Sequence, residues 1–207
     1  MKYAFTLAEV LITLGIIGVA AALTMPSLIA KYEEKAAVTA LKKFSSTFGQ
    51  LFIKRNYETG EDFRLVLSQY GTTNNDALEE WFNLNLKPYL NVVKQGQVGT
   101  VVYSQCPVGG GFAFFLSDGM CAGIDDYSKT QSVNEFGVNT DDDDSVLGLF
   151  VDINGMKRPN KYGRDRFMFV YDSKGLHPAG MDNPKVCNAA TLQYCTSKMI
   201  QDGKITY

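Results

Sequence analysis

Hydrophobic positions are densest at the start of the chain. Residues 5–23 read FTLAEVLITLGIIGVAAAL, nineteen residues with one charge, Glu9. At the 1.5 Å rise per residue of an α-helix, this run is long enough to cross a bilayer once. Lys2 precedes it, and positive residues before a span favour the cytoplasmic side. The pattern predicts a single-pass helix with the C-terminal bulk of the chain outside the cytoplasm.

A second pattern begins after Pro26. Apolar residues recur at steps of three and four, which is typical of an amphipathic helix whose apolar face needs a cover. They are Val38, Leu41, Phe44, Phe48, Leu51 and Phe52. Pro26 removes a backbone donor and Gly18 weakens the helix before it, so we expect a kink or local melting there.

Basic residues are frequent along the same stretch. We expect them to form its solvent-facing side, and contact with acidic surfaces of neighbouring molecules is the alternative. The six are Lys31, Lys35, Lys42, Lys43, Lys54 and Arg55.

The remainder of the chain changes from a helical to a strand pattern. Asn75 begins a capped helix that carries Trp81, which we assign to the core. Asp118-Gly119 is a strong hairpin signal. The predicted strands are Val98–Ser104, Gly111–Ser117, Met120–Ile124, Val146–Ile153 and Arg166–Tyr171. The expected fold class is α+β, with a long N-terminal transmembrane and stalk helix packed on a small antiparallel sheet of four or five strands.

Composition excludes some functions. The chain is 45% hydrophobic and 20% charged with a net charge of −2, which is typical of a globular protein and argues against a nucleic-acid partner. His177 is the single histidine, and no nucleophile–base set, paired-carboxylate motif or phosphate loop is recognisable. Residues 109–111, three glycines, are expected to form a turn. We therefore do not expect an enzyme.

The four cysteines suggest two disulfides in an oxidising compartment. Four cysteines allow three pairings. The local pairs Cys106–Cys121 and Cys187–Cys195 are favoured because each closes a short loop, with about 3 kcal/mol for each in the loop-entropy model. Reduced, buried thiols are the alternative.

One loop carries oxygen-bearing residues around glycine turns. Asp152, Asn154 and Asp165 could contribute to a Ca²⁺ site, since Ca²⁺ takes six to eight oxygen ligands. The spacing is not that of an EF-hand, and such residues also form turns and caps without metal. No other cofactor is expected.

The acidic run 141–144 is expected to be a solvated loop, with a weak cation contact as the alternative.

Glu9 separates the interpretations of the apolar run. Placing an acid in hydrocarbon costs about 2–3 kcal/mol. A cleaved secretory signal or a plain signal anchor would leave the presence of Glu9 unexplained. No partner for Glu9 is evident within the run, so we expect the partner to come from another chain. A protonated Glu9 bonded within its own helix is the alternative.

Residues 4–9, AFTLAE, followed by the apolar run, resemble the processing site of type IV prepilins and type II secretion pseudopilins. The resemblance implies that a membrane-embedded prepilin peptidase cuts between Ala4 and Phe5 and methylates Phe5. Gly18 and Pro26 also lie where the family often has Gly and Pro. The family usually has Gly at the position of Ala4.

The resemblance implies a domain organisation and a role. Residues 1–4 would be the leader, 5–57 the N-terminal helix (5–27 transmembrane, 28–57 stalk) and 58–207 the head.

Glu9 would pair with the amino terminus of Phe5 in a neighbouring subunit. The chain would be a structural subunit of a type IV pilus or type II secretion pseudopilus, in the bacterial inner membrane and then in a filament. Its partners would be copies of itself or related pilins, the prepilin peptidase and the inner-membrane assembly machinery. A signal-anchored extracytoplasmic enzyme or binding protein and a DNA-uptake pilin are the alternatives.

Overall fold

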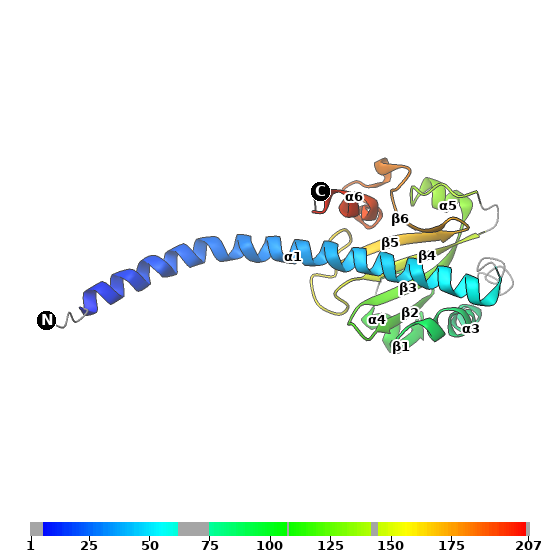
Figure 1. Cartoon of the computed structure of the whole chain (residues 1–207), viewed down its shortest axis with the longest axis horizontal. Coiled ribbons are helices and arrows are strands. Elements are labelled where there is room, and N and C mark those ends of the chain that lie inside the picture. Colours follow the sequence, from blue (N-terminus) through cyan, green and yellow to red (C-terminus); the bar gives the residue numbers. More distant parts are fainter. Residues whose placement is uncertain (1–5, 62–74, 107, 142–144, 206–207) are drawn as a thin grey trace. The chain divides into compact units, whose positions relative to one another are not determined.

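The computed structural model of the protein describes residues 6–61, 75–106, 108–141 and 145–205 (Figure 1). Contacts divide the chain into two compact units, Met1–Ala36 and Ala37–Tyr207. The second unit is called the head.

Helix α1 runs from Leu7 to Thr59 without interruption. It passes through Gly18 and Pro26, so the local melting expected there does not occur. Proline removes one N–H donor, so a single hydrogen bond of the helix is lost at Pro26 while the helix continues on both sides of it. Hydroxyls in that region also bond to the helix backbone: Thr24 Oγ1 donates to the Ala20 carbonyl at 2.9 Å and Ser27 Oγ to the Thr24 carbonyl at 2.9 Å.

The head contains a six-stranded antiparallel sheet whose strands follow one another in chain order, β1 to β6. Asp118-Gly119 lies in the β2–β3 hairpin as expected, and Gly119 takes the positive φ of 92° that this turn requires. The strands are β1 (Val92–Gln97), β2 (Phe112–Leu116), β3 (Cys121–Ser128), β4 (Ser145–Asp152), β5 (Arg166–Asp172) and β6 (Gly175–Pro178).

The C-terminal part of α1 supplies one side of the main core. Its periodic apolar residues from Val38 to Phe52 are buried, and they pack with the side chains of one sheet face, among them Phe114 and Phe169. Helix α3 (Asn75–Asn85) adds Trp81 to this core, as expected. The α+β fold class is therefore confirmed: a long helix packs on an antiparallel sheet.

The opposite sheet face has two smaller apolar clusters, one around Cys106 and Cys121 and one around Phe136 and Met168. The remaining helices are short. They are the α-helices α4 (Val101–Gln105), α5 (Lys129–Asn134) and α6 (Thr196–Asp202), and the 3₁₀ turns η1 (Lys87–Tyr89), η2 (Pro184–Val186) and η3 (Leu192–Tyr194).

The strands predicted from the sequence differ from those of the structure at three places: one predicted strand is mostly helix, and two strands of the sheet were not predicted. Most of the predicted strand Val98–Ser104 is helix α4, because the Thr100 hydroxyl caps a helix by accepting from the Tyr103 N–H at 3.2 Å. Strands β1 and β6 were not predicted, which is why the sheet has six strands instead of four or five.

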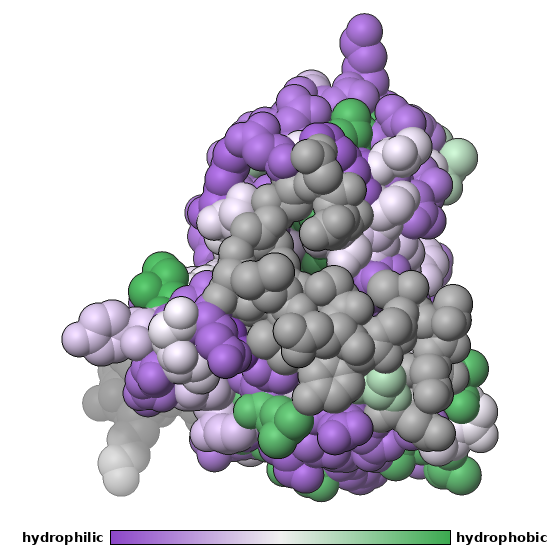
Figure 2. All heavy atoms as spheres, turned by 90° about the vertical axis from the view of Figure 1, so that its right-hand side faces the viewer, coloured by the Kyte–Doolittle hydropathy of each residue, from purple (hydrophilic) through white to green (hydrophobic). Residues whose placement is uncertain are grey.

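The surface of the head differs from that of the first unit. On the face in Figure 2, hydrophilic residues predominate and the hydrophobic residues stand apart from one another, where that face is described. Exposed apolar side chains of the head include Ile53, Leu84, Val93 and Met156. Single exposed apolar residues are normal for a water-soluble domain.

Candidate functional site

The N-terminal part of α1 is apolar on all sides. No residue from Thr6 to Ala36 is buried. Among the described residues, α1 is the one helix long and apolar enough to cross a membrane. A helix that is hydrophobic all round requires lipid or other protein around it. Its exposed large side chains are Leu7, Val10, Leu11, Ile12, Leu14, Ile16, Ile17, Val19, Leu23, Met25, Leu28 and Ile29.

Glu9 folds back onto the first turn of this helix. Its Oε2 accepts hydrogen bonds from the Thr6 N–H at 2.9 Å and the Thr6 hydroxyl at 2.8 Å, while Thr6 Oγ1 accepts from the Glu9 N–H at 3.3 Å. This reciprocal arrangement is a capping box. The expectation that no partner lies within the apolar run was wrong: Thr6 is one, and the Thr-x-x-Glu spacing before an apolar stretch was the signal for it.

Among the residues that the structure describes, no positively charged group pairs with Glu9. Thr6 is a neutral donor, and within the described residues Glu9 Oε1 has no hydrogen bond. The positive end of the helix dipole lies beside the carboxylate and favours it there. Ala4 and Phe5, the residues of the expected cleavage, lie outside the described residues. The site is therefore a carboxylate held at a helix N-terminus on an otherwise apolar surface.

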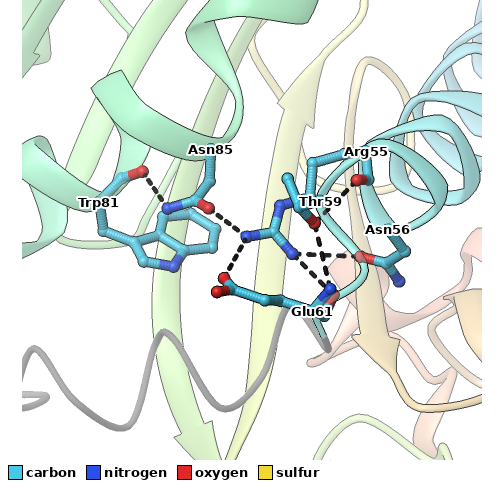
Figure 3. A network of polar contacts seen from close by, with 6 residues as sticks. All are labelled: Arg55, Asn56, Thr59, Glu61, Trp81 and Asn85. Atoms are coloured by element: carbon cyan, nitrogen blue, oxygen red, sulfur yellow. Dashed lines mark hydrogen bonds and ion pairs between the residues drawn. The ribbon is translucent and has the colours of Figure 1, made fainter.

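Arg55 does not belong to the solvent-facing side of α1, to which the sequence assigned it. The residue is 2% exposed, and its guanidinium donates to Asn85 Oδ1 at 2.6 Å and to the Glu61 carbonyl at 3.0 Å (Figure 3). Asn85 in turn donates to the Trp81 carbonyl at 2.9 Å. This network joins the end of α1 to α3. Lys43 is exposed and pairs with Asp118 at 2.7 Å in the β2–β3 hairpin.

Both favoured disulfides form. Cys106–Cys121 joins the end of α4 to β3, and Cys187–Cys195 closes an eight-residue separation near the C-terminus. The reduced alternative is therefore not adopted.

Asp152, Asn154 and Asp165 lie together as the sequence suggested, but their carboxylate oxygens are already bonded. Arg166 Nε and the Asn154 N–H donate to Asp152, and the backbone N–H groups of Asn160 and Lys161 donate to Asp165. Asn154 Nδ2 also donates to Asp165 at 3.2 Å. Burial raises the pKa of Asp152 to about 6, although the Arg166 bond lowers it. This geometry is that of turns and caps, the alternative to Ca²⁺.

The remaining candidates have structural surroundings. His177 Nε2 lies 2.8 Å from Asp172 Oδ1 across the β5–β6 hairpin. Gly109 and Gly110 have positive φ and form the expected turn. Asp141 pairs with Lys174 at 2.8 Å, and residues 142–144 of the acidic run lie outside the described residues. In the part of the chain that the structure describes, no group of three or more His, Cys, Asp or Glu side chains is placed to hold a metal ion.

The fold and this segment define a class: an α+β head with an N-terminal helix of membrane-spanning length. Comparison with family models adds that residues 27–194 match a family of unknown function, DUF6613, so the chain belongs to that family. The match begins directly after Pro26 and does not include the Thr6–Glu9 capping box. Searches among curated proteins and among solved structures found no match.

Proposed function

We propose that the protein is a filament subunit of the type IV pilus or type II secretion pseudopilus kind. The N-terminal part of α1 lies in the bacterial inner membrane as a single pass, and the head is extracytoplasmic. A prepilin peptidase cleaves between Ala4 and Phe5 and methylates Phe5, and the inner-membrane assembly machinery adds the subunit to copies of itself or related pilins.

The observation that carries this proposal is the position of Glu9. It is the single acid on the apolar part of an uninterrupted helix whose C-terminal part forms the core of the head. A charge in hydrocarbon costs about 2–3 kcal/mol even on lenient scales, so a merely anchoring helix has no use for it.

The capping box suggests how Glu9 is accommodated before and after assembly. In a lone subunit, Thr6 satisfies one carboxylate oxygen by two hydrogen bonds. In a filament, the amino terminus of a neighbouring Phe5 supplies the missing positive charge. Removing one partner of a buried ion pair strands the other, so the pair sets the register between subunits.

The two disulfides agree with the proposed location of the head. Structural disulfides persist in oxidising compartments and are rare in the cytoplasm. Cys106, Cys121, Cys187 and Cys195 are all paired, as an extracytoplasmic head would require.

The proposal is tested by comparing Glu9→Gln with Thr13→Val in cells that produce the native protein. Thr13 lies on the same apolar stretch and its hydroxyl donates to the Val10 carbonyl at 3.0 Å within its own helix, so Thr13→Val controls for a changed side chain in the span. We expect both variants in the membrane fraction and only Glu9→Gln missing from sheared filaments. Equal amounts of both variants in filaments would contradict the proposal, as would the absence of filaments containing the unmodified chain. A membrane-tethered protein would give that last result.

A further inference from the structure

Asp125 lies on the sheet face opposite α1. On β3, Ala122 and Ile124 belong to the core shared with α1, whereas Cys121 and Tyr127 belong to the clusters of the other face. Because side chains alternate along a strand, Asp125 points to the same side as Cys121 and Tyr127. This carboxylate is half-buried.

Gly148 on β4 is the strand partner of Asp125, and Gly110, in the loop before β2, lies against the backbone of the preceding residue Ile124. A tyrosine contacts each of these two glycines. On one side, Asp125 pairs with Gly148, and a Cβ on Gly148 would lie 2.5 Å from the Tyr127 ring. On the other side, a Cβ on Gly110 would lie 2.6 Å from the Ile124 carbonyl, and the Tyr103 hydroxyl donates to the Gly110 carbonyl at 2.7 Å. The Tyr127 ring therefore lies over Gly148, the partner of Asp125 on β4, and the Tyr103 hydroxyl is bonded to the loop that lies against Ile124 on the other side of β3.

Further aromatic rings hold Tyr127 in place. Its ring contacts Phe136 edge to face at a centroid distance of 4.9 Å and lies 6.1 Å from Phe150. Phe136 in turn packs on Tyr194 at 5.4 Å. Because these contacts fix the ring, Tyr127 is preorganised and a ligand would not have to order it.

The electrostatics of the group are those of an uncompensated anion. One Asp125 oxygen accepts from the Asp126 N–H at 2.9 Å, and no ion pair involves Asp125 within the described part of the chain. Burial raises the pKa of Asp125. Burial and then the nearby Asp125 charge raise the pKa of the Tyr103 and Tyr127 hydroxyls. A cation placed here would stabilise the ionised carboxylate.

We propose that Asp125, Tyr103 and Tyr127 form a binding site for an organic ammonium group, such as the end of a lysine side chain. The Asp125 carboxylate accepts N–H bonds from the ammonium group, and charge-assisted hydrogen bonds are stronger than neutral ones. The tyrosine rings attract the cation through their π-faces. The site is distinct from Glu9 and does not depend on filament assembly.

The first test is calorimetric titration of the full chain with butylammonium, in a non-ionic detergent and phosphate buffer at low salt. Detergents or buffers that contain amines would compete for the site. We expect saturable binding of butylammonium and none of 1-pentanol, which has a similar apolar length without charge. Absence of butylammonium binding, or equal binding of the alcohol, would overturn the proposal.

Variants locate the site. Asp125→Asn preserves shape, and we expect it to weaken butylammonium binding by about tenfold or more, as does loss of a charge-assisted bond. Glu80→Gln removes an exposed carboxylate of α3 and should leave binding unchanged. Tyr103→Leu tests the ring contribution separately if Asp125→Asn does not fold, and it should also weaken binding. Unchanged affinity in Asp125→Asn or in a folded Tyr103→Leu would overturn the assignment.

A third experiment identifies the source of the ammonium group. Carbodiimide treatment of native membranes couples carboxylates to lysines in contact. A cross-link from Asp125 to a lysine of a second, isotope-labelled copy would identify a protein lysine as the ligand. Butylammonium binding without such a cross-link would identify a free amine.

Discussion

Arg55 is withdrawn from solvent at the end of α1, and its guanidinium satisfies Asn85 Oδ1 and the Glu61 carbonyl. Arg55→Met keeps the apolar length of the side chain but leaves the buried Asn85 Oδ1 without its donor. We expect the free energy of unfolding to fall by about 2–4 kcal/mol. Thermal unfolding of the full chain in detergent, followed by circular dichroism, measures the effect. Lys42→Ala on the exposed side of α1 is the control, with a change within about 0.5 kcal/mol. Equal stability of both variants would show that the network contributes nothing.

Asp126 makes the head sensitive to pH. Burial raises its pKa from 3.8 to about 6, although a Ser145 bond lowers it. An acid with a raised pKa contributes stability below its unfolded pKa, and that contribution is lost as the pH rises through about 6. Asp126→Asn should therefore raise the free energy of unfolding by about 1 kcal/mol at pH 7.5, less than the full shift in pKa implies because solvent screens a half-buried charge, and leave it unchanged at pH 3.5. Glu80→Gln should change it at neither pH. Destabilisation by Asp126→Asn at pH 7.5 would contradict this account.

At the scale of elements, replacing either of two glycines by alanine is expected to change the free energy of unfolding, in opposite directions for the two. Gly155 has a φ of 66° in the β4–β5 loop, and its Cα faces the Gly119 carbonyl of the β2–β3 hairpin, so an added Cβ would clash with backbone. Gly155→Ala should lower the free energy of unfolding by more than about 1 kcal/mol. Gly49 lies in α1 with open space around it. Gly49→Ala should therefore raise the free energy of unfolding by about 0.5–1 kcal/mol. Melting curves of the two variants check both signs, and stabilisation by Gly155→Ala would contradict the described contact.

The elements that the sequence predicted well have strong periodicity or an unambiguous turn. The stalk helix and strands β2 to β5 were recognised because their buried faces are almost entirely apolar. Strand β1 was missed because VVKQGQ has no alternation of apolar and polar residues, and β6 because it has four residues that end in proline. Helix α4 was mistaken for a strand because its valines favour β-structure and the Thr100 cap was overlooked.

The candidate site was predicted in part. The apolar run, the isolated acid Glu9 and both disulfides were evident from the residues alone. The Thr6 bond required recognition of a capping box in the first turn. Burial of Arg55 could not be predicted, because its acceptors come from residues up to thirty positions away. Long-range polar networks leave no periodic signal in a sequence.

At the scale of the whole molecule, the chain combines a membrane-type helix with an α+β head of a family of unknown function. The filament proposal depends on the first thirty residues, which include Glu9 and the apolar run. The N-terminus of the mature protein is therefore the place to test whether the chain is a filament subunit.

The most direct test is intact mass and N-terminal sequencing of the protein purified from its native membrane. The account predicts a chain that lacks residues 1–4 and begins at N-methylated Phe5. A chain that begins near Ala22 or later would identify a secreted protein with a cleaved signal. An intact Met1 would identify a tethered protein that the prepilin peptidase does not process. Either of these two results would contradict the filament-subunit account.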